Sequence, residues 1–203
     1  MLKPKNIALF FGSFNPIHVG HQIIANHVAQ LDTVDEVWLV VSPQNPHKTK
    51  ASLLSDHHRL YMTKIAVDDN PNLKVSDIEF KLPQPSYTVD TLAHITEKYP
   101  HHKFSLIMGE DNLRTFHKWK NYEVILENHP IVVYPRVLSV QEIDKGVDQN
   151  ELLKHPNFTL LEDAPLMKIS ASFIRKGIKN KRDVRYLLTE PVNKYCDEMG
   201  FYR

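Results

Sequence analysis

The chain has 203 residues, 42% hydrophobic and 24% charged, which is ordinary globular composition and excludes global disorder. It carries 25 Lys and Arg against 24 Asp and Glu, so its formal net charge of +1 gives no support for bulk attraction to nucleic acid or an acidic membrane. The single cysteine, Cys196, excludes an internal disulfide and a multi-cysteine zinc site.

The amino terminus carries no recognisable targeting signal. Its apolar run, Ile7–Phe11, is too short for a signal peptide, and no small-residue cleavage site follows it. No stretch approaches the roughly 20 apolar residues that a membrane span needs. We therefore expect a cytoplasmic protein with neither a membrane nor a nucleic acid among its partners.

Short apolar and β-branched runs, typical of strands buried on both faces, alternate with helical patterns along the chain. The expected strands are residues 7–11, 37–41, 73–78, 104–108, 131–134 and 158–161. The expected helices are one with Ile24, Val28 and Leu31 at helical spacing, one from Ser55 to before Asn70, one from Thr88 to before Pro100, and a short one over 122–126. Residues 136–156 have no clear period and are expected to form a loop or a short helix.

This alternation predicts a parallel sheet with helices on both faces, that is, a doubly wound α/β fold. We expect one domain over residues 1–203, with a small helical part over about residues 170–203. Ligands of such folds bind beyond the carboxyl ends of the strands. The loops that follow the strands are therefore the candidate binding sites. The adjacent histidines 57 and 58 are expected to face solvent.

The loop after the first expected strand has the strongest functional pattern. Gly12 and Gly20 bracket it, Pro16 restricts it, and His18 and His21 share one face of a helical first turn. Together with the N–H groups of a helix N-terminus, these histidines form an anion site suited to phosphate. An ordinary turn with surface histidines is the simpler alternative. A metal site is a further alternative, but the loop holds no Cys or carboxylate as a third ligand.

A second phosphate-binding pattern occurs near the carboxyl terminus, in residues 169–175. Ser170 is a good helix N-cap, so the N–H groups of Ala171 and Ser172 are expected to face a ligand. Arg175 adds a permanent charge and a planar fork for phosphate oxygens. A plain helix cap and a solvated surface charge are the alternatives for Ser170 and Arg175.

These two segments resemble known motifs. Residues 12–21 resemble the signature of the nucleotidyltransferase superfamily that carries a His-x-Gly-His motif, and residues 169–175 are similar to its second motif, Ile-Ser-x-Thr/Ser-x-Ile-Arg. Three further segments sharpen the resemblance to bacterial nicotinate-nucleotide adenylyltransferases: 45–48, 86–92 and 109–113, the last followed by 116–119. Residues 184–187 and 191–195 also resemble the end of that family. Two positions depart from the pattern. Phe11 replaces a glycine of many members, and Ser172 replaces the commoner threonine but keeps its hydroxyl.

The resemblance implies a Rossmann-like nucleotidyltransferase fold. It also implies transfer of the adenylyl group of ATP to nicotinate mononucleotide, giving deamido-NAD and pyrophosphate in NAD biosynthesis. ATP and nicotinate mononucleotide are thus the expected partners. Mg²⁺ is expected to enter with ATP, held by phosphates and water rather than by a protein metal site. Another transferase of the superfamily, such as a phosphopantetheine adenylyltransferase, and a non-catalytic nucleotide-binding module are the alternatives.

The mononucleotide's own phosphate is the nucleophile, so the protein has to supply positioning and charge stabilisation. The resemblance implies catalytic roles for His18, His21, Lys48 and Arg175. The residues expected to bind ATP are Gly12, Ser13, Phe14, His18, Gly20, His21, Gly109, Asp111, Ile169, Ser170, Ser172 and Arg175. Those expected to bind nicotinate mononucleotide are Ser13, Asn15, Lys48, Tyr87, Thr88 and Trp119.

Three further assignments have a structural alternative. Asp111 and Thr88 are both candidate helix caps, and Trp119 is a candidate core residue. The sequence leaves open the oligomeric state and the degree of preference for nicotinate over nicotinamide.

Overall fold

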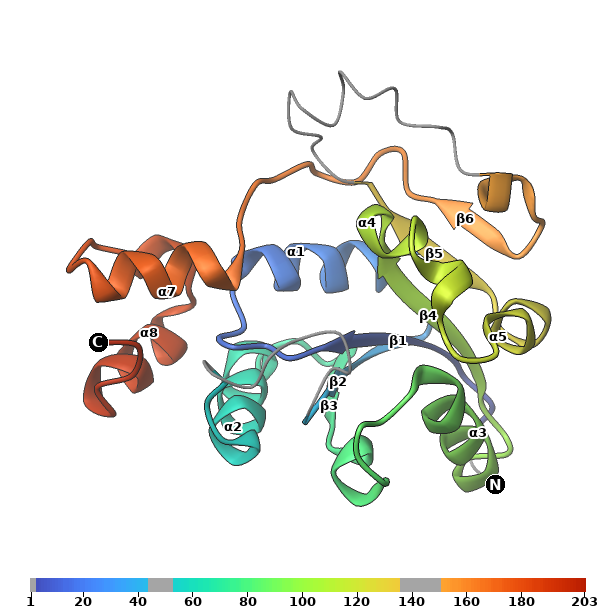
Figure 1. The fold of residues 1–203 in the computed structure, drawn as a ribbon, viewed down its shortest axis with the longest axis horizontal. Helices are drawn as coiled ribbons and strands as arrows, with labels where there is room; N and C mark the ends of the chain where they lie inside the picture. Colours follow the sequence, from blue (N-terminus) through green and yellow to red (C-terminus); the bar gives the residue numbers. More distant parts are fainter. Residues whose placement is uncertain (1–2, 44–52, 136–150) are drawn as a thin grey trace.

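The computed structural model of the chain describes residues 3–43, 53–135 and 151–203. Its centre is a six-stranded sheet in the order β3-β2-β1-β4-β5-β6, with every neighbouring pair parallel (Figure 1). The strands are β1 (Asn6–Gly12), β2 (Glu36–Val41), β3 (Leu73–Ser76), β4 (Lys103–Gly109), β5 (Ile131–Tyr134) and β6 (Phe158–Leu160). The predicted doubly wound α/β fold is confirmed.

Five of the described helices connect strands, and two follow the last strand. They are α1 (Val19–Val28), α2 (Asp56–Val67), α3 (Thr88–Lys98), α4 (Glu110–Leu113), α5 (Tyr122–Asn128), α7 (Ala171–Lys179) and α8 (Glu190–Glu198). Short 3-10 helices cover Ile78–Lys81, Phe116–Lys118, Glu151–Lys154 and Arg185–Leu187. The third strand is shorter than predicted, because Ile78 enters the core from a 3-10 turn rather than from an extended strand.

Both faces of the sheet are buried, which explains the continuous apolar runs. Along β1, Ala8 belongs to a first core, with buried residues of α1, α2, α7 and α8. Its neighbours Ile7 and Leu9 belong to a second core, with buried residues of α3 and α5. Each fully buried aliphatic side chain of this kind contributes roughly 1.5–3 kcal/mol to stability.

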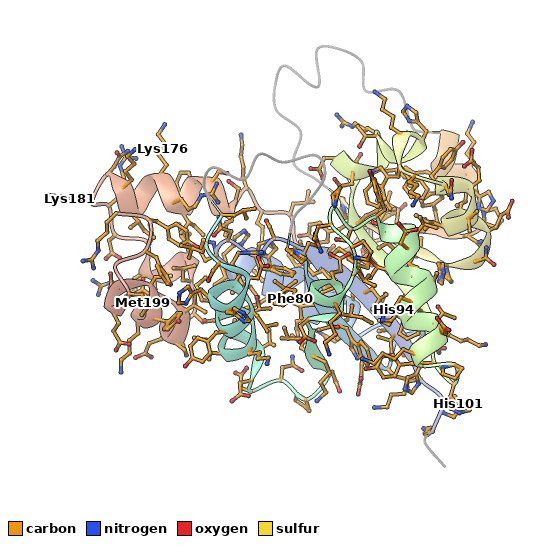
Figure 2. All side chains as sticks on the ribbon, turned by 60° about the horizontal axis from the view of Figure 1, so that its bottom comes forward. Phe80, His94, His101, Lys176, Lys181 and Met199 are labelled. Carbon is orange, nitrogen blue, oxygen red and sulfur yellow. The ribbon has the colours of Figure 1, made fainter. Side chains whose placement is uncertain are left out.

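The carboxyl-terminal helices α7 and α8 lie at one end of the molecule, beside α1 and α2 (Figure 1). Figure 2 shows Lys176 and Lys181 at this end and His101 at the other. Nδ1 of His58 in α2 lies 2.8 Å from the hydroxyl of Tyr195 in α8. The expectation that His58 faces solvent was therefore wrong, because α8 covers it.

The sheet has its switch point between β1 and β4, which are neighbours in space. The helix after β1 packs on the first core, through Ala25 and Val28. The helix after β4 packs on the second core, through Leu113. Because the two connections leave in opposite directions, a crevice opens at the carboxyl ends of these strands. Among the described residues, no helix is long and apolar enough to span a bilayer.

Candidate active site

A pocket of about 600 Å³ lies at this switch point. Three segments supply most of its lining: the loop after β1, the junction of β4 and α4, and the chain that leads into α7. Every residue predicted to bind ATP lines the pocket: Gly12, Ser13, Phe14, His18, Gly20, His21, Gly109, Asp111, Ile169, Ser170, Ser172 and Arg175. Phe11, at the position that departs from the family pattern, also lines it.

The two histidine rings lie against each other at the start of α1, tilted by 30°. His18 is the N-cap residue, and its ring centroid lies 3.7 Å from that of His21. The backbone N–H of His18 donates to Nδ1 of His21 at 3.3 Å. Because Nδ1 accepts this bond, neutral His21 carries its proton on Nε2 and can donate it to an oxygen ligand. The prediction that both side chains share one face is confirmed.

Burial controls the charge of His18. Its side chain is almost fully buried, and Nδ1 has no hydrogen-bond partner within the described part of the chain. Desolvation lowers the pKa of His18 from 6.5 to about 4. A Cβ at Gly20 would lie 3.0 Å from Nδ1, so the missing side chain at this glycine makes room for the imidazole. The free protein therefore holds His18 neutral at physiological pH.

This shift makes stability depend on pH. The unfolded chain binds a proton at His18 near pH 6.5 and the folded chain only near pH 4, so stability falls as pH drops through that interval. The loss is on the order of 3 kcal/mol between pH 7 and pH 4. We expect His18→Gln to reduce this pH dependence in urea unfolding experiments, whereas His101→Gln, at an exposed histidine, keeps it. If the free energy of unfolding changed equally with pH in wild type and His18→Gln, the burial argument would be contradicted.

The start of α7 joins the loop after β1 through Arg175. Nη1 of Arg175 donates to the carbonyl of Asn15 at 2.7 Å, across 160 positions of sequence, and Nη2 donates to Oγ of Ser172 at 3.1 Å. Arg175 is half-buried, so it is not a solvated surface charge. Oγ of Ser170 accepts the N–H of Phe173 at 3.2 Å, which confirms Ser170 as the cap of α7. The two predicted phosphate-binding segments thus meet in one pocket.

Asp111, after β4, also lines the pocket. The N-cap of α4 is Gly109, so Asp111 is not the cap residue. A Cβ at Gly109 would lie 2.5 Å from Oδ1 of Asp111, which means that the carboxylate folds back over the end of β4. This placement presents a hydrogen-bond acceptor at the pocket.

Three residues predicted to bind nicotinate mononucleotide do not line this pocket. Tyr87, and not Thr88, is the N-cap of α3, and its ring lies 4.9 Å from Nζ of Lys120. Tyr87 and Lys120 line a separate hollow of about 340 Å³. Trp119 is half-buried and packs edge-to-face on Phe116, with 5.5 Å between ring centroids, as a core residue would.

The other residues predicted for this substrate are Ser13 and Asn15, which do line the main pocket. Oδ1 of Asn15 accepts hydrogen bonds from the N–H of Leu54 at 3.3 Å and from the hydroxyl of Tyr202 at 2.8 Å. Lys48 lies outside the described residues.

Two positively charged residues next to the site were missed. Lys168 lines the pocket just before α7. Arg59 in α2 is fully buried, and its Nη1 donates to the carbonyl of Ser13 at 2.6 Å. One sequence signal was available, because Arg59 shares a helical stripe with Met62 and Ala66, which are core residues.

Known proteins resemble this chain over almost its whole length. The protein named "Probable nicotinate-nucleotide adenylyltransferase" of Flavobacterium psychrophilum is 54% identical over 197 residues, which is 97% of this chain and 98% of the relative. The protein of the same name in Christiangramia forsetii is 55% identical over 199 residues, 98% and 99% of the two chains. The chain belongs to the nicotinate-nucleotide adenylyltransferase family.

The wider family and the fold agree with this membership. The cytidylyltransferase-like family model matches residues 9–177. The structure of Plasmodium falciparum nicotinic acid mononucleotide adenylyltransferase complexed with NaAD superposes with a TM-score of 0.77. The superposition covers 98% of this chain and 97% of the Plasmodium chain, at 21% sequence identity. At this identity the likeness supports the fold alone. The resemblance to nicotinate-nucleotide adenylyltransferases inferred from the motifs is therefore confirmed.

Proposed function

We propose that the chain is the enzyme that transfers the adenylyl group of ATP to nicotinate mononucleotide, giving deamido-NAD and pyrophosphate in NAD biosynthesis. The observation that carries the proposal is the hydrogen bond from Arg175 to Asn15, which joins the two phosphate-binding motifs in one pocket. High identity to relatives with this name over the full length supports the same reaction.

In the proposed reaction, a phosphate oxygen of the mononucleotide attacks the α-phosphorus of ATP. The bond between that phosphorus and the α–β bridging oxygen breaks, and pyrophosphate leaves with the bond's electron pair. No protein nucleophile takes part. Cys196, the one cysteine of the chain, is buried, and burial raises the pKa of its thiol to about 12.

Different pocket residues bind different parts of ATP. His18 and His21 donate N–H groups to the α- and β-phosphates, and Arg175 holds the β/γ end with the α7 N-terminus. Asp111 accepts hydrogen bonds from the ribose hydroxyls. In-line transfer through such a site depends on positioning and on charge stabilisation as pyrophosphate leaves.

We place nicotinate mononucleotide between the pocket and the hollow at α3. Ser13 and Asn15 would contact its phosphate side, together with Lys48. Tyr87 and Thr88 begin α3, whose N–H groups would receive the nicotinate carboxylate. Lys120, the next residue after Trp119, contacts both Tyr87 and Asp90 at the start of α3. Trp119 would therefore lie near the nicotinate site and offer its remaining ring surface to the pyridine.

Mg²⁺ fits this pocket as a companion of ATP. Among the described residues that line the pocket, Asp111 is the only carboxylate, and the described chain contains no cluster of three His, Cys, Asp or Glu that could hold a metal. The ion would neutralise phosphate charge, held by phosphate oxygens and water. A cytoplasmic location remains part of the proposal, in keeping with a chain that has one free cysteine.

The proposal predicts a preference for the acid over the amide. A carboxylate at the start of α3 accepts N–H bonds at the positive end of the helix, whereas a neutral amide gains less. We expect kcat/KM for nicotinate mononucleotide to exceed that for nicotinamide mononucleotide by about tenfold or more, the factor that 1.4 kcal/mol confers. Equal values would refute the proposed carboxylate site.

The same pyrophosphate-release assay tests the function itself. Nicotinate mononucleotide should give turnover with ATP, and phosphopantetheine should give none. Turnover with phosphopantetheine alone would reassign the substrate. ATP binding without turnover on any acceptor would indicate a non-catalytic nucleotide-binding module.

A further inference from the structure

A fully buried arginine, Arg59, lies behind the proposed active site and reaches it through the backbone carbonyl of Ser13. It has no exposed surface and is the largest fully buried side chain of the described residues. Burying a permanent charge is costly unless every donor is paired. The contacts of its guanidinium therefore show what this charge stabilises.

The guanidinium has five N–H donors, and five hydrogen bonds are present. Nη1 donates to the carbonyls of Ser13 at 2.6 Å and Ser42 at 2.8 Å. Nη2 donates to the carbonyl of Pro43 at 3.2 Å and to Oδ1 of Asp56 at 2.5 Å. Nε donates to the carbonyl of Leu54 at 3.0 Å. Four of the five acceptors are thus backbone carbonyls.

These carbonyls belong to three different places in the chain. Ser13 lies in the loop after β1, Ser42 and Pro43 follow β2, and Leu54 precedes α2. The N–H of Leu54 in turn donates to Oδ1 of Asn15. Arg59 therefore holds the loop after β1 at two points, directly at Ser13 and through Leu54 at Asn15.

Ser13 and Asn15 both line the proposed phosphate pocket. The carbonyl of Asn15 also accepts a hydrogen bond from Arg175. The loop is thus fixed from its core side by Arg59 and from its pocket side by Arg175. Lysine at position 59 would keep a charge but could not reach five acceptors in three directions, because an ammonium has three donors on one atom.

We propose that Arg59 is a positioning residue for adenylyl transfer, which sets the loop after β1 against the ends of β2 and α2 so that Ser13 and Asn15 meet the reacting phosphates in one geometry. This role rests on the proposed function. A displacement of about 1 Å in a positioning group can cost on the order of 10²-fold in rate. The effect of losing the guanidinium should accordingly appear in kcat.

The test compares Arg59→Lys with Met62→Ala. Met62 is fully buried in the same helix and does not line the pocket, so its truncation destabilises the packing of α2 without removing any hydrogen bond of Arg59. Steady-state kinetics with ATP and nicotinate mononucleotide are measured well below the lower of the two melting temperatures. We expect both variants to lower Tm. We expect Arg59→Lys alone to lower kcat, by about tenfold or more, with KM for ATP changing less than about threefold.

A second pair of variants keeps the test decisive if Arg59→Lys does not fold. Asp56 is a half-exposed acceptor outside the pocket. Asp56→Ala should lower kcat by about threefold or more. Asp56→Asn keeps an acceptor oxygen and should therefore retain most of the wild-type kcat.

The outcomes separate the two claims. A wild-type chain without deamido-NAD formation would contradict the proposed function and this role with it. Normal wild-type turnover combined with normal kcat in Arg59→Lys would overturn the role of Arg59 alone. Equal kcat in wild type, Asp56→Ala and Asp56→Asn would overturn it in the same way. If Met62→Ala lowered kcat as much as Arg59→Lys, lost stability and not lost positioning would explain the effect of Arg59→Lys, and the proposed role would be overturned.

Discussion

His18→Ala should reduce the turnover of deamido-NAD formation by about 10²-fold or more, the scale of losing a major transition-state contact. His18 is held at the start of α1 by burial and by its ring contact with His21, with a ring-centroid distance of 3.7 Å. Its pKa of about 4 keeps it neutral in the free protein, so it meets the phosphates as a preset N–H donor. The donor contributes most when negative charge shifts toward the leaving pyrophosphate.

Three comparisons make this measurement specific. His18→Asn keeps a good N-cap and an N–H donor, so it should retain more turnover than His18→Ala. His101→Ala, at the opposite end of the molecule from α7 (Figure 2), should behave like wild type. Wild-type turnover in His18→Ala would refute the assignment. A non-catalytic nucleotide-binding module would instead bind ATP in both forms and turn over in neither.

The second large effect is expected at Arg175. Arg175→Ala should lower kcat/KM for ATP by about 10²-fold or more, because it removes a charged contact to phosphate that strengthens in the transition state. It also removes the hydrogen bond to the carbonyl of Asn15. Arg175→Lys keeps the charge but loses the planar fork, so it should recover only part of the activity.

Lys176→Ala is the matched control for Arg175. Lys176 is the next residue of α7, carries the same charge and is exposed at the outer end of the molecule (Figure 2). Its removal should leave kcat/KM for ATP within about twofold of wild type, as expected for a solvated charge. Equal losses at positions 175 and 176 would mean that net charge, and not the placement of Arg175, controls ATP binding.

Local patterns were sufficient for much of the fold. The β-branched run at Val37–Val41 and the residues around Ile131–Tyr134 lie within or coincide with observed strands, because buried parallel strands need apolar residues on both faces. The pattern failed at Ile78, where an apolar residue reaches the core from a 3-10 turn. It also failed at His58, whose polarity indicated solvent although α8 covers it.

The candidate site was predictable where its residues lie close together in the chain. His18 and His21 share a helical face by spacing alone, and Ser170 caps α7 as its position before the helix suggests. The contact between Arg175 and Asn15 could be expected only through the family resemblance, since no local rule connects residues 160 positions apart. Tyr87 and Trp119 show the limit of predicting the site from the sequence, because the structure places them outside the main pocket.

By itself, the sequence determined the alternating elements, the two phosphate-binding segments and the family to which the chain belongs, because each depends on spacing within a few residues. Only the tertiary structure decided which of these segments meet, how deeply His18 is buried and what the charge of Arg59 contacts. The physical reason is that burial and hydrogen bonding depend on groups distant in sequence. The guanidinium of Arg59 is stable without solvent because carbonyls from three separate loops and the carboxylate of Asp56 surround it.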